Sequence, residues 1–126
     1  MATPIVLFQH ETPVQFTCGT LRDVTVTVEP MAAGKGKVRL FITAPSCRFN
    51  NGGKEIVREF EATSATDAIV VVFNVSITCA LPQIYTIVLA VEATNSANET
   101  GDDRITAKAN CQKTVTPTTS TTNVVI

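Results

Sequence analysis

The amino-acid sequence predicts an all-β fold, an antiparallel β-sandwich of about seven to eight strands that carries two disulfide bonds. Valine and threonine dominate the composition, and both are β-branched residues that suit a pleated sheet. Apolar and polar residues alternate in several segments, and no window shows the spacing of an amphipathic helix. Turn-forming residues separate these segments at intervals typical of sandwiches.

Seven strands are expected between residues 14 and 111, in addition to a short apolar run at residues 4–8. In chain order the expected strands are residues 14–18, 24–28, 38–44, 56–62, 68–79, 84–93 and 104–111. The clearest alternation is that of Val24, Val26 and Val28 with Thr25 and Thr27, which marks a half-buried strand.

The segments between and within these strands add three expectations. Residues 30–37 contain two glycines and are expected to form a loop. Residues 56–62 carry charges among their apolar side chains, as edge strands do. Residues 68–79 are long and mostly apolar, which favours a position at the centre of a sheet.

The domain is expected to span residues 1–113, followed by a Thr-rich linker and an apolar C-terminal arm over residues 114–126. The arm ends in Val124, Val125 and Ile126. We expect these residues, like the run at residues 5–8, to add to a sheet edge of their own domain or of a neighbour. The alternative is a disordered C-terminal tail.

Four cysteines, Cys18, Cys47, Cys79 and Cys111, lie at or just beyond the ends of the first, third, fifth and seventh expected strands. Odd-numbered strands run in one direction, so all four should gather at one pole. We predict two disulfides, with three pairings open and four buried free thiols as the alternative. Zinc is not expected, because no CxxC motif occurs and His10 is the only histidine. Two disulfides predict an oxidising compartment, a virion or a hyperthermophile.

The segment at residues 82–91, with sequence PQIYTIVLAV, resembles the sixth strand of immunoglobulin-like and PKD-like domains. A lone tyrosine after a proline-containing turn, here Tyr85, forms a tyrosine corner in such folds. The chain has no tryptophan, so the Cys…Trp…Cys core of antibody domains is absent. The resemblance implies a first strand parallel to the last, and with it the pairs Cys18–Cys111 and Cys47–Cys79.

The composition and motifs argue against several classes of function. The net charge is −1, from ten basic and eleven acidic residues without a basic cluster, so nucleic acid is not an expected partner. The longest apolar run is too short to span a bilayer. No catalytic motif occurs, and Glu55, Glu59 and Glu61 fit a solvated edge, so we do not expect an enzyme. His10, between two breaks, is expected at the surface or at a strand edge.

One loop is a candidate cation site. Asn98, Glu99, Asp102 and Asp103 offer the oxygen ligands that calcium prefers, and an ordinary solvated loop is the alternative. Asn98 also begins an Asn-Glu-Thr glycosylation acceptor pattern. No other cofactor is expected.

These features favour a non-enzymatic structural or assembly module. We expect a homo-oligomeric subunit of an extracellular filament, pilus-like fibre or surface layer, in contact with copies of itself or with other surface or particle proteins through strand edges and terminal arms. The first alternative is a virion decoration or minor capsid protein, which fits the lack of signal-peptide features in the first residues. The second is a secreted adhesion module that binds glycan or protein.

Overall fold

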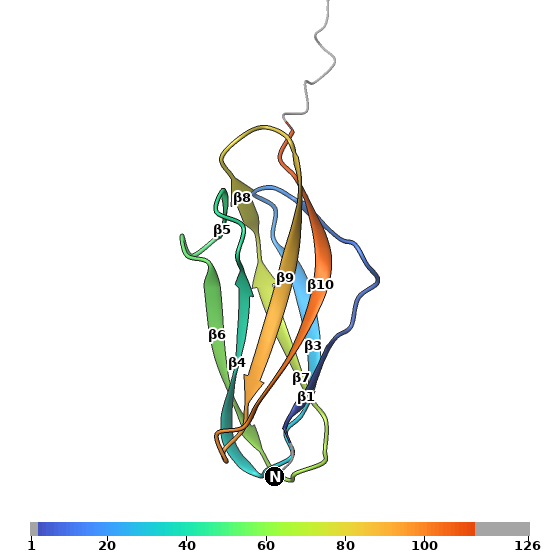
Figure 1. Ribbon diagram of the computed structural model, residues 1–126, viewed down its shortest axis with the longest axis vertical. Helices are drawn as coiled ribbons and strands as arrows, with labels where there is room; N and C mark the ends of the chain where they lie inside the picture. The colour runs from blue at the N-terminus through green and yellow to red at the C-terminus, as the bar shows by residue number, and fades with distance from the viewer. Residues whose placement is uncertain (1–2, 113–126) are drawn as a thin grey trace, which may run out of the picture.

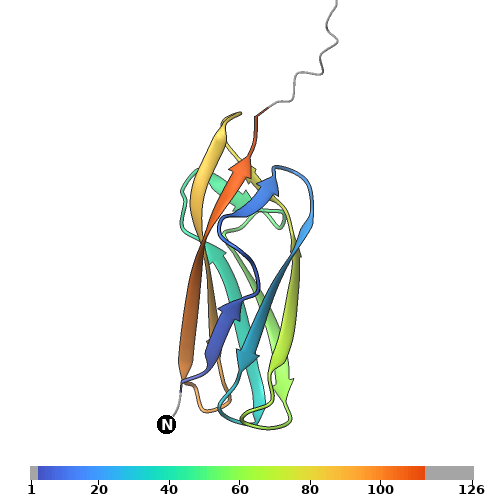
Figure 2. The ribbon, with the colours of Figure 1, turned by 90° about the vertical axis from the view of Figure 1, so that its right-hand side faces the viewer.

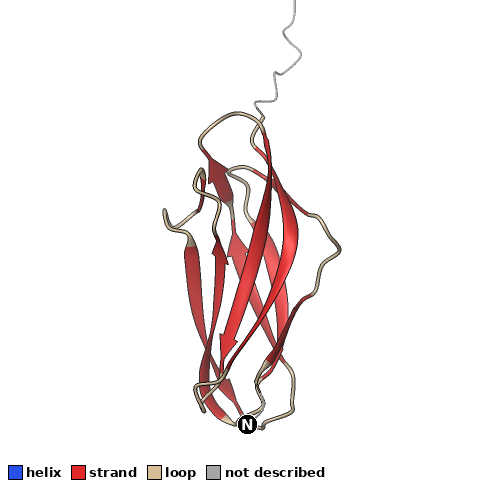
Figure 3. Ribbon diagram, in the orientation of Figure 1, coloured by secondary structure: helices blue, strands red, loops and turns tan. Residues whose placement is uncertain are grey.

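The computed structural model describes residues 3–112, and this part of the chain is all-β, as predicted (Figures 1 and 3). It contains ten strands rather than seven or eight, and none of the described residues forms a helix that could cross a membrane. The strands are β1 (Ile5–Phe8), β2 (Val14–Thr17), β3 (Arg22–Glu29), β4 (Gly34–Ile42), β5 (Cys47–Phe49), β6 (Glu55–Ala62), β7 (Ile69–Val75), β8 (Ile77–Cys79), β9 (Ile84–Thr94) and β10 (Thr100–Asn110).

The strands form three sheets. A three-stranded sheet has the order β1-β3-β7, a five-stranded sheet has the order β2-β10-β9-β4-β6, and β5 pairs with β8. All pairs are antiparallel except β2 with β10, which is parallel. Figure 2 separates the two larger sheets, with β3 and β7 on one side and β9 and β10 on the other.

The core lies between the two larger sheets, because each strand turns one side chain in two inward. Val24, Val26 and Val28 of β3 are fully buried, which confirms the predicted alternation. Phe73 of β7 and Leu40 of β4 belong to the same buried cluster, so both sheets contribute to one core. Burial of such side chains stabilises a fold by about 1.5–3 kcal/mol each.

Strand β4 begins earlier than expected. Residues 34–37, predicted as part of a loop, are the first four residues of β4. Gly36 pairs with Phe60 of β6, and a Cβ at Gly36 would meet the Phe60 ring and lie 2.5 Å from the Thr94 carbonyl oxygen. Glycine is therefore part of the strand here, because a cross-strand phenylalanine occupies the space of its side chain.

The prediction of one central strand over residues 68–79 was wrong. Ser76 separates β7 from β8, and the two strands belong to different sheets. Within residues 3–112, β7 pairs only with β3 and lies at the edge of its sheet, where Val70 is 62% and Val72 is 43% exposed. In contrast, β6 lies at the edge of the five-stranded sheet, as its charges predicted.

The four cysteines meet at one end of the elongated domain, which we call the disulfide pole (Cys18, Cys47, Cys79 and Cys111). The described part of the chain leaves the domain there after β10, whereas β1 begins at the opposite end (Figure 1). The turns that join β3 to β4 and β9 to β10 also lie at that opposite end.

Candidate functional site

The disulfide pole contains two cysteine pairs, Cys18–Cys111 and Cys47–Cys79. Cys18 follows β2 and Cys111 follows β10, and the parallel pairing of these strands brings the two Cα atoms to 4.8 Å. Cys47 and Cys79 are directly opposite in the β5–β8 pair, with Cα atoms 4.1 Å apart. Two disulfide bonds at one pole are thus confirmed, in the pairing that the resemblance implied.

The two disulfides also lie close to each other, which the spacing of the cysteines did not predict. The Sγ atoms of Cys18, Cys79 and Cys111 all lie within 4.8 Å of one another. Cys47 is fully buried, while the other three cysteines are partly exposed. The spacing of the cysteines lacks a CxxC pair and so gave no reason to expect a metal, whereas the shared direction of the strand ends predicted that the four cysteines would gather.

The outer surface of the three-stranded sheet is uncharged in its middle, between Asp23 and Glu29 at the two ends of β3. We call it the Val–Thr face, and its members project away from the core on three adjacent strands. They are Ile5, Leu7, Thr25, Thr27, Val70 and Val72. The register places Leu7, Thr27 and Val70 in one row across the sheet. Leu7 is 50% exposed, so this row of side chains is accessible to solvent.

The outer surface of the five-stranded sheet is charged instead. Arg39 on β4 pairs with Glu55 on β6 at 2.6 Å and with Glu92 on β9 at 3.1 Å. The hydrogen bond that Arg39 donates to Glu55 is the main reason that the pKa of Arg39 is raised, and the opposite charges of both glutamates add to it. This face therefore has the mixed charge of an ordinary solvated surface.

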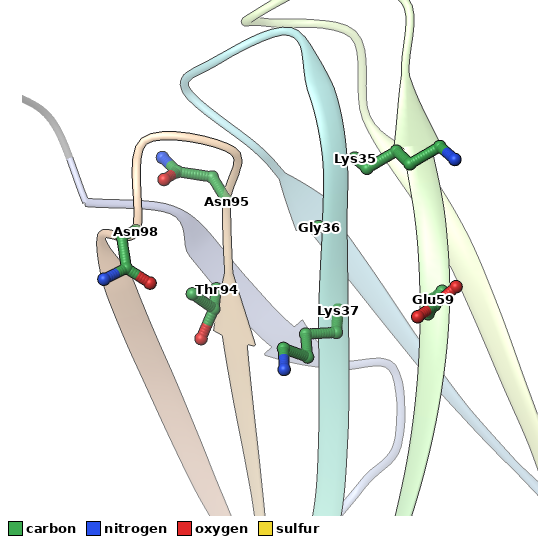
Figure 4. A pocket seen from close by; sticks show the side chains of 7 residues that line it. All are labelled: Lys35, Gly36, Lys37, Glu59, Thr94, Asn95 and Asn98. Atoms are coloured by element: carbon green, nitrogen blue, oxygen red, sulfur yellow. The ribbon is translucent and has the colours of Figure 1, made fainter.

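A shallow hollow lies farther along the same face, between β4, β6 and β9 (Figure 4). Lys37 and Glu59 are cross-strand partners there, and Figure 4 shows the Lys37 side chain pointing toward Thr94. The lining also includes Lys35, Gly36, Asn95 and Asn98. Glu59 is the one carboxylate among the described residues that line the hollow, so they offer no pair of carboxylates.

The predicted calcium ligands occupy the turn between β9 and β10 and the first part of β10. Asn98 is exposed in the turn with φ 65°, and Glu99 follows it. Asp102 and Asp103 are consecutive in β10, so the pleat points them to opposite faces. An Asp103 carboxylate oxygen already accepts a 3.0 Å hydrogen bond from the amide of Phe8. The structure does not gather the four side chains, and the calcium and glycosylation hypotheses stay predictions.

His10 lies where the chain leaves β1 for β2. Its Nε2 atom accepts a 2.9 Å hydrogen bond from the amide of Thr25 on β3, which fits the predicted strand-edge role. Desolvation, and secondarily the charge of Arg22, lower the pKa of His10 below its ordinary value of 6.5. The neutral imidazole thus takes the place of a backbone acceptor. The predicted arm residues Val124, Val125 and Ile126 lie outside the described residues.

Comparison of the sequence with models of known protein families finds no match, and comparison with curated proteins finds none either.

Proposed function

We propose that this chain is a non-enzymatic structural module, a subunit of an extracellular filament, fibre or surface layer. In this proposal, subunits join by strand addition at the free edge of β7. Main-chain hydrogen bonds provide affinity in such contacts, and alternate side chains define the register. The proposal is carried by one observation, the unprotected edge of β7.

The other edge strands of the two larger sheets, β1, β2 and β6, carry features that disfavour pairing. The amide of Phe8 at the edge of β1 is bonded to Asp103, and the carbonyl of Gln15 on β2 accepts a 2.7 Å hydrogen bond from Arg22. On β6, half of the residues are charged, which disfavours pairing with another chain.

β7 lacks such protection. Its sequence, IVVVFNV, contains no charge, proline or glycine, and among the described residues only β3 pairs with it. A long apolar edge of this kind is the usual site of edge-to-edge association. The adjoining Val–Thr face extends the apolar area beyond the edge itself, so a strand added to β7 would meet apolar side chains.

We propose residues 123–126 of a neighbouring copy as the added strand. Their sequence, NVVI, is uncharged and β-branched like that of β7. The spacer at residues 117–122 can reach about 20 Å. The described chain leaves at the disulfide pole beside β10, whereas β7 belongs to the other sheet, which favours a neighbour over the same subunit.

An immunoglobulin-like sandwich is the architecture that we propose for this module. The order β1-β3-β7 against β2-β10-β9-β4-β6, with β2 parallel to β10, supports it. Tyr85 supports it as well, because its hydroxyl accepts a 2.9 Å hydrogen bond from the amide of Leu81, the contact expected of a tyrosine corner. The two disulfides are compatible with an extracellular location.

Deletion of residues 119–126 tests the arm. We expect the truncated protein to lose its oligomers in light scattering while keeping its circular dichroism spectrum and melting temperature. Each buried aliphatic side chain lost from the contact would weaken it by about 1.5–3 kcal/mol. Unfolding would place the arm in its own sheet, and unchanged assembly would favour the adhesion-module alternative. Either result would refute the proposal.

Substitution at β7 tests the receiving edge. Val72→Lys places a positive charge on β7 beside the receiving edge, and we expect this variant to be monomeric. Val88→Lys on β9 is the matched control, because Val88 is 46% exposed, close to the 43% of Val72, but lies on the other sheet. Equal loss of oligomers in both variants would show a general solubility effect and contradict a specific role for β7.

A further inference from the structure

We infer that Cys18, Cys47, Cys79 and Cys111 form a tetrahedral zinc site when their two disulfides are reduced. Three of the four sulfurs already lie within 4.8 Å of one another. The fourth, of Cys47, is bonded to that of Cys79 but lies outside this group of three. Four thiolates are the ligand set of structural zinc sites and select thiophilic cations.

The geometric change needed is small for three of the four sulfurs and larger for that of Cys47, which has to turn toward Cys18 and Cys111. Zn–S bonds of about 2.3 Å in a tetrahedron require sulfurs about 3.8 Å apart. Reduction lets each bonded pair separate toward this value, while Cys79 has to approach Cys18 and Cys111 from within 4.8 Å by about 1 Å. Side-chain rotation about χ1 can provide such shifts without a change of the strands.

The main chain holds the cysteines together independently of the disulfides. The amide of Cys18 donates a 3.0 Å hydrogen bond to the carbonyl of Asn110, next to Cys111. The amide of Gly19 donates at 3.1 Å to the carbonyl of Ile77, which links the end of β2 to β8. These contacts join one disulfide to the other, so the four thiols should stay neighbours after reduction.

The surroundings suit a metal with four thiolate ligands, which carries a net charge of −2. The Lys54 ammonium donates hydrogen bonds to the carbonyls of Ala44 and, at 3.3 Å, Cys47, so a positive charge lies close to the site. Among the described residues, none that lines the adjacent hollow has a carboxylate that would compete with the sulfurs. Besides three of the cysteines it is lined by Gly19, Thr78, Ala80, Leu81 and Pro82.

The chemistry requires a reductant and then the metal. Each disulfide takes up two electrons and two protons, and a water-soluble phosphine supplies the electrons as it is converted, with one water, to its oxide. Two phosphines thus yield four thiols. Binding of one Zn²⁺ then releases up to four protons as the thiols become thiolates. Zinc would cross-link the four cysteines of the pole in a reducing compartment, as the disulfides do in an oxidising one.

Titration of the phosphine-reduced full chain with Zn²⁺ under anaerobic conditions tests the inference. We expect one Zn²⁺ per chain, proton release, and a rise in melting temperature, because a ligand that binds the folded state stabilises it. Co²⁺ in place of Zn²⁺ should show the absorption of a tetrahedral tetrathiolate complex. A melting temperature that is unchanged or lowered by zinc would overturn the inference, since the metal would then bind weakly or only to unfolded thiols.

Variants assign the ligands. Cys47→Ala should remove the tetrathiolate cobalt spectrum, and the double variant Cys18→Ala/Cys111→Ala should weaken zinc binding by at least about 100-fold. Should the reduced chain unfold without metal, we expect Zn²⁺ to restore the circular dichroism spectrum of the oxidised protein. Failure to refold, or full zinc affinity in the double variant, would refute the site.

Discussion

The two disulfides enclose loops of different length, and this difference predicts how much each stabilises the domain. The Cys18–Cys111 bond joins residues 93 apart and the Cys47–Cys79 bond joins residues 32 apart. In the chain-entropy model, closing loops of these lengths contributes about 4.7 and about 3.7 kcal/mol at 25 °C. The longer loop should therefore stabilise by about 1 kcal/mol more.

Comparing one variant with another would mix this effect with packing, because Cys47 is fully buried and its replacement leaves a cavity. The comparison is cleaner within each variant. Cys47→Ala/Cys79→Ala keeps only the longer loop, and Cys18→Ala/Cys111→Ala keeps only the shorter one. For each variant, the free energy of unfolding is measured oxidised and reduced, so that the cost of the substitutions cancels.

The assay is denaturant unfolding followed by circular dichroism, with a chelator present so that zinc cannot bind the thiols. For a domain of about 110 residues, 1 kcal/mol corresponds to about 4 °C in melting temperature, so the difference is measurable. Equal or greater stabilisation by the shorter loop would refute the reasoning from loop length. If all four thiols alkylate in the unreduced, denatured protein, the disulfides themselves are absent.

Three further predictions concern other parts of the fold. Gly101→Ala should lower the free energy of unfolding in urea by about 1–3 kcal/mol, because a Cβ at Gly101 would collide with the Pro4 carbonyl. Gly53→Ala is the control and should be neutral, because a Cβ there would meet only a nearby asparagine side chain. Equal effects of the two substitutions would contradict the role of the close approach between Gly101 and Pro4. The lowered pKa of His10 means that the unfolded chain binds more protons near pH 6.5, so the free energy of unfolding should fall as the pH is lowered through this value. His10→Ala should remove this pH dependence and the hydrogen bond to Thr25, and an unchanged pH profile would refute it. A chelator should leave the melting temperature of the oxidised protein unchanged, whereas a large shift reversed by calcium would establish the β9–β10 turn as a calcium site.

Local patterns predicted what depends on single strands. The period of two over Val24, Val26 and Val28 located both β3 and its buried face, because burial on one side of a strand acts on every second residue. The prediction that the four cysteines gather at one pole depended on strand direction, because alternate strands of the chain run the same way. Both inferences need only the geometry of strands and their order along the chain.

What the sequence did not reveal depends on neighbours in space. The apolar run that contains Val70 and Val72 looked central, but apolar content does not show whether a second strand covers it. Gly36 looked like a loop residue because its role depends on the ring of Phe60, 24 positions away. The contact between the two disulfides is likewise a property of the assembled pole, so spacing along the chain gave no sign of it.

The Cys18–Cys111 bond determines how the domain would respond to tension between its ends. A pull applied at Thr3 and Gln112 passes along β1 and β2 to Cys18, crosses the bond to Cys111 and leaves the domain. The chain between Cys18 and Cys111 bears no load. The greatest length that the pulled chain can reach is therefore that of residues 3–18 fully extended, about 50 Å, instead of about 360 Å for the whole described chain. Reduction of this one bond would turn an almost inextensible link into a long elastic tether.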